Sequence, residues 1–131
     1  IVPLLPDGSV LLEREFRYPL NSWCVSLPAG LIDAGETLEE AVARELSEET
    51  GYRLRDDIVP AVRPLPQPGF SSTGLTEENV QVVFAQVEPR PDSAELIEPF
   101  TVARADLRAF LDANQLPIGT RCQLILELLA L

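Results

Sequence analysis

The 131-residue chain contains no histidine, no lysine and no methionine. Because imidazole is absent, histidine-based catalysis and histidine metal ligands are excluded, and proton transfer must come from carboxylates, tyrosine or water. Arginine supplies all 10 basic side chains against 21 acidic ones, and the net charge is −11. This balance argues against nucleic acid as the main ligand, because phosphate backbones are bound by basic surfaces.

Cysteine and long apolar runs are also scarce. Cys24 and Cys122 offer neither a disulfide framework nor a metal-binding spacing, so we expect buried thiols in a reducing compartment. No apolar run approaches the ~18 residues of a membrane span and no signal peptide is visible, which favours a cytoplasmic protein without a membrane partner. We predict a single domain over residues 1–131. We expect a missing N-terminal segment, because Ile1 falls inside a predicted strand and the chain has no methionine.

The most informative stretch begins at Gly30 and ends at Tyr52. Thr37 and Glu40 match a capping box, which predicts that a helix starts at Thr37, and Gly51 supplies a left-handed stop. At about 100° per residue, the apolar residues of this helix fall on one stripe that should face the core. The stripe consists of Leu38, Ala41, Val42 and Leu46.

Acidic residues occupy the C-terminal half of the same stripe. Glu45 and Glu49 lie within it and Glu48 lies on its edge. A solvated acidic face is the alternative explanation, but it fits the Glu residues on other sides of the helix better. Crowded, partly buried carboxylates repel one another, and a hard divalent cation removes that cost. We therefore favour a metal site, with Arg44 spaced to pair with Glu48.

These residues resemble the Nudix box, and every fixed position of that pattern is filled. The resemblance implies an α/β/α sandwich with a mixed β-sheet, classed as α/β (α+β). It also implies a hydrolase of nucleoside diphosphates that are linked to another moiety. The matching residues are Gly30, Glu36, Arg44, Glu45, Leu46, Glu48, Glu49, Gly51 and Tyr52.

The resemblance also implies roles for the acidic residues. Glu45 and Glu49 would be the main ligands of Mg²⁺ or Mn²⁺, and Glu48 a further ligand. The backbone carbonyl of Ala29 would join them, and Glu36 would brace the loop before the helix. The resemblance therefore implies that Glu48 and Glu49 are catalytic residues as well as metal ligands. The chemistry is consistent, because metal ions neutralise pyrophosphate and lower the pKa of water.

Two segments before the helix resemble the ADP-ribose pyrophosphatase subfamily. The sequence from Arg14 to Pro19 is similar to its Arg-Gln-Tyr/Phe-Arg stretch, which implies that Arg17 binds phosphate. A surface ion pair is the alternative for Arg17. The sequence from Trp23 to Gly30 resembles its Trp…Glu-Leu-Pro-Ala-Gly, but Ser26 stands where the subfamily has Glu. Trp23 is a candidate for stacking on a base, although a lone strand aromatic can equally be core or interface.

A loop after the helix extends the resemblance. Pro68 lies sixteen residues after Tyr52, as in ADP-ribose hydrolases. The loop is similar to the subfamily's Ser-Pro-Gly…Gly-Leu-Thr-Asp-Glu, but Gln67 replaces the Ser. This similarity implies that Glu78 is the general base, with Glu77 as the alternative. Phe70 is a further candidate for substrate binding. The competing interpretation is a plain surface loop.

Periodicity predicts strands mixed with helices, which suits a mixed sheet between helices. In the last predicted helix, Leu124, Leu128 and Leu131 share one stripe. Besides the helix after Thr37, the expected helices are 106–114 and 120–131. The expected strands or extended segments are 1–5, 10–17, 23–27, 54–59, 61–65, 79–87 and 98–102.

The combined prediction is a metal-dependent hydrolase that splits ADP-ribose or a related nucleoside diphosphate sugar into a nucleoside monophosphate and a sugar phosphate. Its ligand is a small nucleotide, with no nucleic-acid or membrane partner. The resemblance implies a homodimer. One alternative is another substrate, such as UDP-glucose, GDP-mannose or a housekeeping nucleotide. The second is a non-catalytic domain that senses ADP-ribose, although such domains usually lose box carboxylates that this chain keeps.

Overall fold

The computed structural model describes residues 1–91 and 98–131, and seven strands in these ranges form one mixed sheet. The strand order is β3-β2-β1-β8-β4, with β5 also paired to β8 and β9 to β2. The pairing of β1 with β8 is parallel, and the other pairs are antiparallel. The strands are β1 (Val2–Leu4), β2 (Val10–Arg17), β3 (Ser22–Ser26), β4 (Tyr52–Leu54), β5 (Val62–Pro64), β8 (Val83–Pro89) and β9 (Glu98–Val102).

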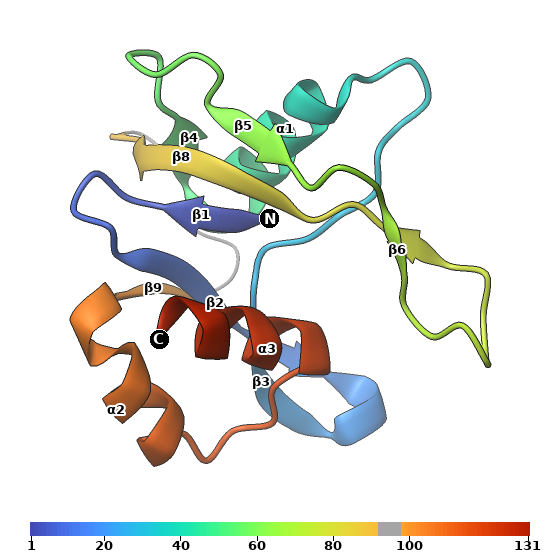
Figure 1. Ribbon diagram of the computed structural model, residues 1–131, viewed down its shortest axis with the longest axis vertical. Coiled ribbons are helices and arrows are strands. Elements are labelled where there is room, and N and C mark those ends of the chain that lie inside the picture. Colours follow the sequence, from blue (N-terminus) through green and yellow to red (C-terminus); the bar gives the residue numbers. More distant parts are fainter. Residues whose placement is uncertain (92–97) are drawn as a thin grey trace.

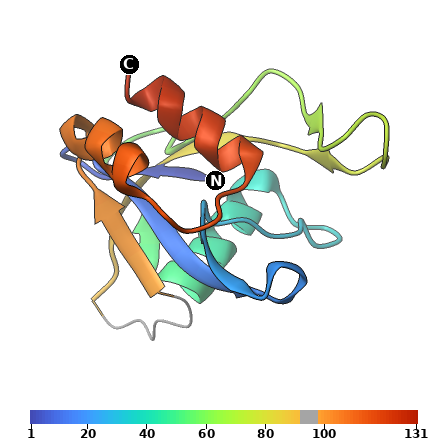
Figure 2. The same cartoon turned by 90° about the horizontal axis from the view of Figure 1, so that it is seen from below.

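Helices cover both faces of this sheet (Figures 1 and 2). Helix α1 (Leu38–Thr50) packs on one face through Val42 and Leu46, against residues of β5 and β8. Helices α2 (Leu107–Ala113) and α3 (Thr120–Leu129) cover the opposite face, where β2, β3 and β9 contribute buried residues. The predicted α/β/α sandwich with a mixed sheet is confirmed.

The ends of α1 follow the predicted capping residues. The Glu40 backbone N–H donates to the Thr37 hydroxyl at 3.2 Å, and the Thr37 N–H donates to the Glu40 carboxylate at 2.8 Å. Gly51 ends the helix with a φ of 72°, the left-handed region in which glycine is not strained. The capping box and the glycine stop are confirmed, and they fix which helix residues face the sheet.

Two predicted extended segments are wrong in their bounds. The segment 54–59 contributes only its first residue to β4, because the chain then bends and β5 takes up the pairing with β8. The segment 79–87 is split into β7 (Asn79–Val80) and β8, and the Gln81 side-chain amide donates to the Leu65 carbonyl at the break. Strand β7 pairs with β6 (Gly69–Phe70) in a hairpin that projects from the main sheet (Figures 1 and 2).

The buried face of α3 differs from the predicted leucine stripe. Leu124 and Leu128 are 59% and 67% exposed, and Leu131 lies beyond the end of the helix. The helix instead packs through Cys122 and Leu126. The sequence Gln-Leu-Ile-Leu-Glu-Leu-Leu is apolar on most sides, so packing against the sheet selects the buried face and periodicity alone does not.

Both cysteines are free and buried, as predicted. Burial raises the pKa of the Cys122 thiol to about 11, so this thiol stays protonated at neutral pH. In the described ranges, no helix combines the length and apolar character of a membrane span.

We expect Leu126→Ala to lower the free energy of unfolding by about 2–5 kcal/mol, because it opens a cavity at a fully buried site. Leu124→Ala on the exposed side of the same helix should change it by less than about 0.5 kcal/mol. Urea denaturation measures both values, and equal costs would contradict the assignment of the buried face.

Candidate active site

Arg44 connects the acidic half of α1 to the loop that precedes the helix. Its Nε and Nη2 atoms donate to the two Glu36 carboxylate oxygens at 2.7 and 2.9 Å. Its Nη1 atom donates to Glu45 Oε1 at 2.8 Å and to Glu48 Oε2 at 3.4 Å, and Nη2 also donates to the Leu31 carbonyl at 2.8 Å. The predicted Arg44–Glu48 pair is present, but the bidentate bond to Glu36 is the tighter contact.

Glu36 holds the loop in place from its other side. Its Oε1 atom accepts a bond from the Asp33 backbone N–H at 3.0 Å. The Arg44 hydrogen bonds, followed by the Asp33 amide, lower the pKa of Glu36 to about 2. Its side chain is only 14% exposed, so solvent screens this pairing less than an ordinary surface ion pair.

The Glu45 carboxyl group packs directly on the backbone of Gly30. A Cβ atom at position 30 would overlap that carboxyl group, so only glycine leaves room for it. The Glu45 side chain is 13% exposed. Gly30 therefore lets the Glu45 side chain lie against the backbone of the loop that connects β3 to α1.

Glu49 lies beside a residue that the sequence patterns did not indicate, Glu13 on β2. Burial and the charge of Glu49 raise the pKa of Glu13, while burial and the charge of Glu45 raise that of Glu49. An interaction with the Ala29 backbone N–H opposes part of the Glu49 shift. Strand alternation could have shown Glu13, because it shares a strand face with the fully buried Leu11.

Buried oxygens without a hydrogen-bond partner gather near these carboxyl groups. In the described part of the chain they are Glu13 Oε2, Glu49 Oε2 and Ser26 Oγ. A buried oxygen without a partner is costly and needs an explanation. A donor set made of carboxylate and hydroxyl oxygens suits a hard divalent cation such as Mg²⁺.

The described carboxylates are not arranged around a common point as they would be in an occupied cation site. Within residues 1–91 and 98–131, no group of three or more Cys, Asp or Glu side chains is gathered closely enough to hold a metal ion. The Glu48 side chain is 58% exposed, and Arg44 occupies one oxygen each of Glu45 and Glu48. The second oxygen of each carboxylate has no bond to Arg44.

Arg17 and Trp23 lie on opposite faces of the sheet. Arg17 shares the β2 face of Glu13 and lowers the pKa of that residue, so it lies within electrostatic reach of the acidic site. Its Nη2 atom contacts Glu15 at 2.8 Å, and its side chain is 55% exposed. Trp23 pairs with Phe16 across the other face, with ring centroids 5.8 Å apart. The structure thus brings Arg17, but not Trp23, toward the carboxylates.

Glu78 lies in the β6–β7 hairpin, directly before strand β7. The Ser71 hydroxyl donates to Glu78 Oε1 at 2.7 Å, and Arg121 at the start of α3 donates to the Ser71 hydroxyl at 3.2 Å. Sequence reasoning missed both Ser71 and Arg121, because they are 50 residues apart in the chain. The connection ties the hairpin to the sandwich and leaves Glu78 Oε2 without a bond to Ser71.

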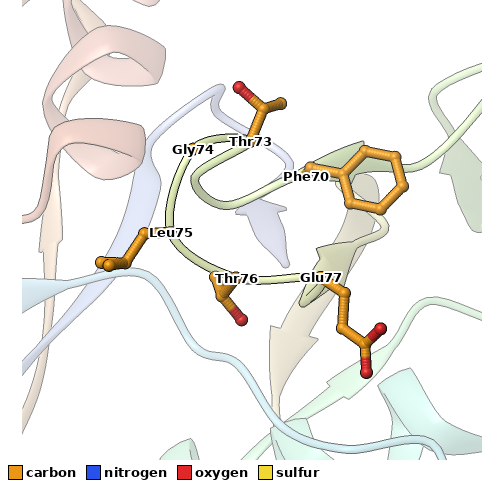
Figure 3. A pocket seen from close by; sticks show the side chains of 6 residues that line it. All are labelled: Phe70, Thr73, Gly74, Leu75, Thr76 and Glu77. Atoms are coloured by element: carbon orange, nitrogen blue, oxygen red, sulfur yellow. The ribbon is translucent and has the colours of Figure 1, made fainter.

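An open hollow of about 630 Å³ lies over the tip of this hairpin and includes Phe70 and Glu77. Figure 3 shows that the side chains lining it spread away from the loop instead of pointing to a common centre. Such a surface lacks the converging polar groups of a ligand site. The hollow is therefore a poorer candidate than the carboxylate cluster.

Comparison with known proteins agrees with the geometry. The NUDIX domain family model matches residues 1–121. An ADP-ribose pyrophosphatase of Saccharomyces cerevisiae is 39% identical over 102 residues, covering 74% of this chain and 43% of that protein. An ADP-sugar pyrophosphatase of Mus musculus is 37% identical over 112 residues, covering 79% and 50%. The crystal structure of an ADP compounds hydrolase superposes with a TM-score of 0.75 at 26% identity, covering 97% and 66%.

The mixed sheet between helices, with Glu45 of α1 packed on Gly30, is consistent with a Nudix class of fold. The match to the family model over most of the chain shows that this protein belongs to the Nudix family. The chain spans about half the length of the curated relatives that it matches, including an uncharacterised Nudix hydrolase of Schizosaccharomyces pombe at 33% identity.

The Glu36–Arg44 pairing predicts a specific dependence of stability on pH. Because the pKa of Glu36 falls from 4.5 to about 2 on folding, wild type should exceed Glu36→Gln in free energy of unfolding above pH 4.5. The excess should shrink as pH falls toward 2. Urea denaturation from pH 2 to 7 measures it, with Glu39→Gln on the exposed side of α1 as control. A difference that is constant over this range would contradict the pairing.

Gly30→Ala should disturb the site and spare the fold, because its Cβ meets the movable end of a side chain. We expect the thermal midpoint to change by at most about 4 °C. We expect Mn²⁺ affinity, measured by calorimetry, to fall about tenfold or more. Gly74→Ala is the control, because a Cβ there meets nothing within 4 Å. Wild-type Mn²⁺ affinity in Gly30→Ala would show that the seat of Glu45 does not matter.

Proposed function

We propose that this chain hydrolyses the pyrophosphate bond of ADP-ribose or a related nucleoside diphosphate sugar, giving a nucleoside monophosphate and a sugar phosphate. The observation that carries the proposal is the packing of Glu45 on Gly30, with Glu49 beside Ala29 and Arg44 fixing the loop. The names of the yeast and mouse relatives support the substrate class. The retained carboxylates favour catalysis over sensing.

Glu45, Glu48 and Glu49, with the Ala29 carbonyl, would hold Mg²⁺ or Mn²⁺. When bound, the cation would neutralise charge on the pyrophosphate and lower the pKa of the attacking water. It would also remove the repulsion between the crowded carboxyl groups, which favours their ionised forms. Arg44 would keep Glu45 and Glu48 in position by holding one oxygen of each.

Other residues would handle the water and the substrate. Glu78 would accept the proton of the attacking water through Oε2, because Ser71 holds Oε1. Arg17 would bind phosphate, since its guanidinium is half-exposed on the face that carries the acidic site. Trp23 and Phe70, which are 46% and 61% exposed, would offer rings to a base. We further propose a cytoplasmic homodimer built from single-domain chains, without a nucleic-acid or membrane partner.

The test is turnover of ADP-ribose, UDP-glucose, GDP-mannose, a diadenosine polyphosphate and 8-oxo-dGTP with Mg²⁺ or Mn²⁺. We expect AMP release mainly from ADP-ribose. Glu49→Gln and Glu78→Gln should each lower kcat by about 100-fold or more, since they remove a ligand and a base. Glu77→Gln is the matched control for the neighbouring loop carboxylate.

Each deviation has a distinct meaning. Preferred turnover of another nucleotide would overturn the substrate and leave the carboxylate site intact. A loss in Glu77→Gln in place of Glu78→Gln would move the base by one residue. Metal-dependent binding of ADP-ribose without turnover would replace the hydrolase by the sensing domain.

A further inference from the structure

Glu13 is a carboxylate in the middle of the sheet. It pairs with Ser26 of β3 on one side and with Pro99 of β9 on the other, and only 2% of its surface is exposed. Glutamate is almost never buried this far unless it has a partner. The position therefore requires an interaction that offsets the loss of water around the carboxyl group.

Within residues 1–91 and 98–131, no arginine side chain forms an ion pair with Glu13. The Ile1 ammonium lies within electrostatic reach of Glu13 and Glu49, but it donates its hydrogen bond to the Pro28 carbonyl at 2.9 Å. In the part of the chain that the structure describes, Glu13 Oε2 has no hydrogen-bond partner. The charges with the largest effect on its pKa are those of Glu49 and Glu15, which are also acidic. Arg17 contributes a favourable charge, but its guanidinium is bonded to Glu15 at 2.8 Å. Without a bound cation, Glu13 shares its site with Glu49, and burial together with the neighbouring acidic charges raises the pKa of both carboxyl groups.

The register of β2 and β3 connects Glu13 to Ser26, one of the positions where this chain departs from the resembled pattern. Ser26 stands where similar sequences carry Glu, and Ser26 is the direct cross-strand partner of Glu13. Side chains of such a pair lie on the same face, with Cβ atoms about 5 Å apart.

We propose that Glu13 is a further oxygen donor to the divalent cation of this site, acting together with Glu49. Three buried oxygens without partners support the assignment, because Glu13, Glu49 and Ser26 contribute one each and lie on adjoining elements. Glu13 is also nearly fully buried and lies within electrostatic reach of Glu49 on α1. The site therefore differs from a group of acidic side chains on the solvated surface. The proposal rests on the proposed function, since it requires that the site holds a divalent cation.

The first experiment titrates Mn²⁺ into wild type, Glu13→Gln and Glu39→Gln by calorimetry, without substrate. Glu13→Gln keeps the shape of the side chain and removes the charge. We expect its Mn²⁺ affinity to fall about 10- to 100-fold. Its thermal midpoint without divalent cation should be unchanged or higher, because the amide is uncharged and adds no repulsion beside Glu49. Glu39→Gln should match wild type in both measurements.

The outcomes separate the two proposals. If wild type itself binds no Mn²⁺, the cation of the proposed function and the role of Glu13 are both overturned. If wild type binds Mn²⁺ and Glu13→Gln binds it within twofold, only the role of Glu13 is overturned. A lower metal-free midpoint with unchanged affinity would make Glu13 a structural residue.

A second set of variants remains informative if Glu13→Gln does not fold. Glu13→Asp keeps the charge and withdraws it by one methylene group, and its Mn²⁺ affinity should be about tenfold weaker. The double variant Glu13→Val with Ser26→Glu moves the carboxylate to the paired position on β3. The double variant should recover most of the Mn²⁺ affinity that Glu13→Val alone loses. The proposal would be overturned if the double variant recovered none of it and Glu13→Asp bound Mn²⁺ as tightly as wild type.

Discussion

The bonds of the Arg44 guanidinium hold together the loop, the helix and the acidic site of this protein. One planar group bonds to Glu36 in the loop, to the Leu31 carbonyl and to Glu45 and Glu48 on α1. It supplies positive charge where the chain concentrates negative charge, and its fork geometry fixes direction as well as distance. Without it, the loop would lose its ion pair to the helix, and Glu45 and Glu48 would lose the positive charge that offsets their repulsion.

The loop before α1 and strand β2 both contribute residues to the acidic site. Gly30 provides the seat for Glu45, β2 places Glu13 against Glu49, and the same strand face brings Arg17 within reach. The site thus lies at the junction of three parts of the fold: the start of the loop, the C-terminal half of α1 and the middle of β2. A cation bound there would be enclosed on the protein side by carboxylates from separate elements, which favours a rigid site.

The sequence predicts the local features well and the long-range features poorly. The capping box and the Gly51 stop follow from the residue types at the helix ends, and the partial burial of Glu45 and Glu49 follows from helical periodicity. All of these features depend on residues within a few turns of one another. The resemblance to the Nudix family added the sandwich fold. By contrast, the buried face of α3 and the break before β8 depend on packing between distant segments. Glu13, Ser71 and Arg121 escaped notice for the same reason, since only the register of strands and the docking of the hairpin reveal their partners.

The spacing of these contacts along the chain has a consequence for how the protein folds. Arg44 is 8 residues from Glu36 and 13 from the Leu31 carbonyl, so the loop–helix unit closes only short loops. Contacts of this kind form early and quickly, whereas Glu13 meets Glu49 only when α1 docks on the assembled sheet. The repulsion between Glu13 and Glu49 therefore raises the free energy of the step in which α1 docks on the sheet. A divalent cation present during folding would then act as a ligand for the last step of assembly, and it would slow the undocking of α1 more than it speeds the formation of the helix.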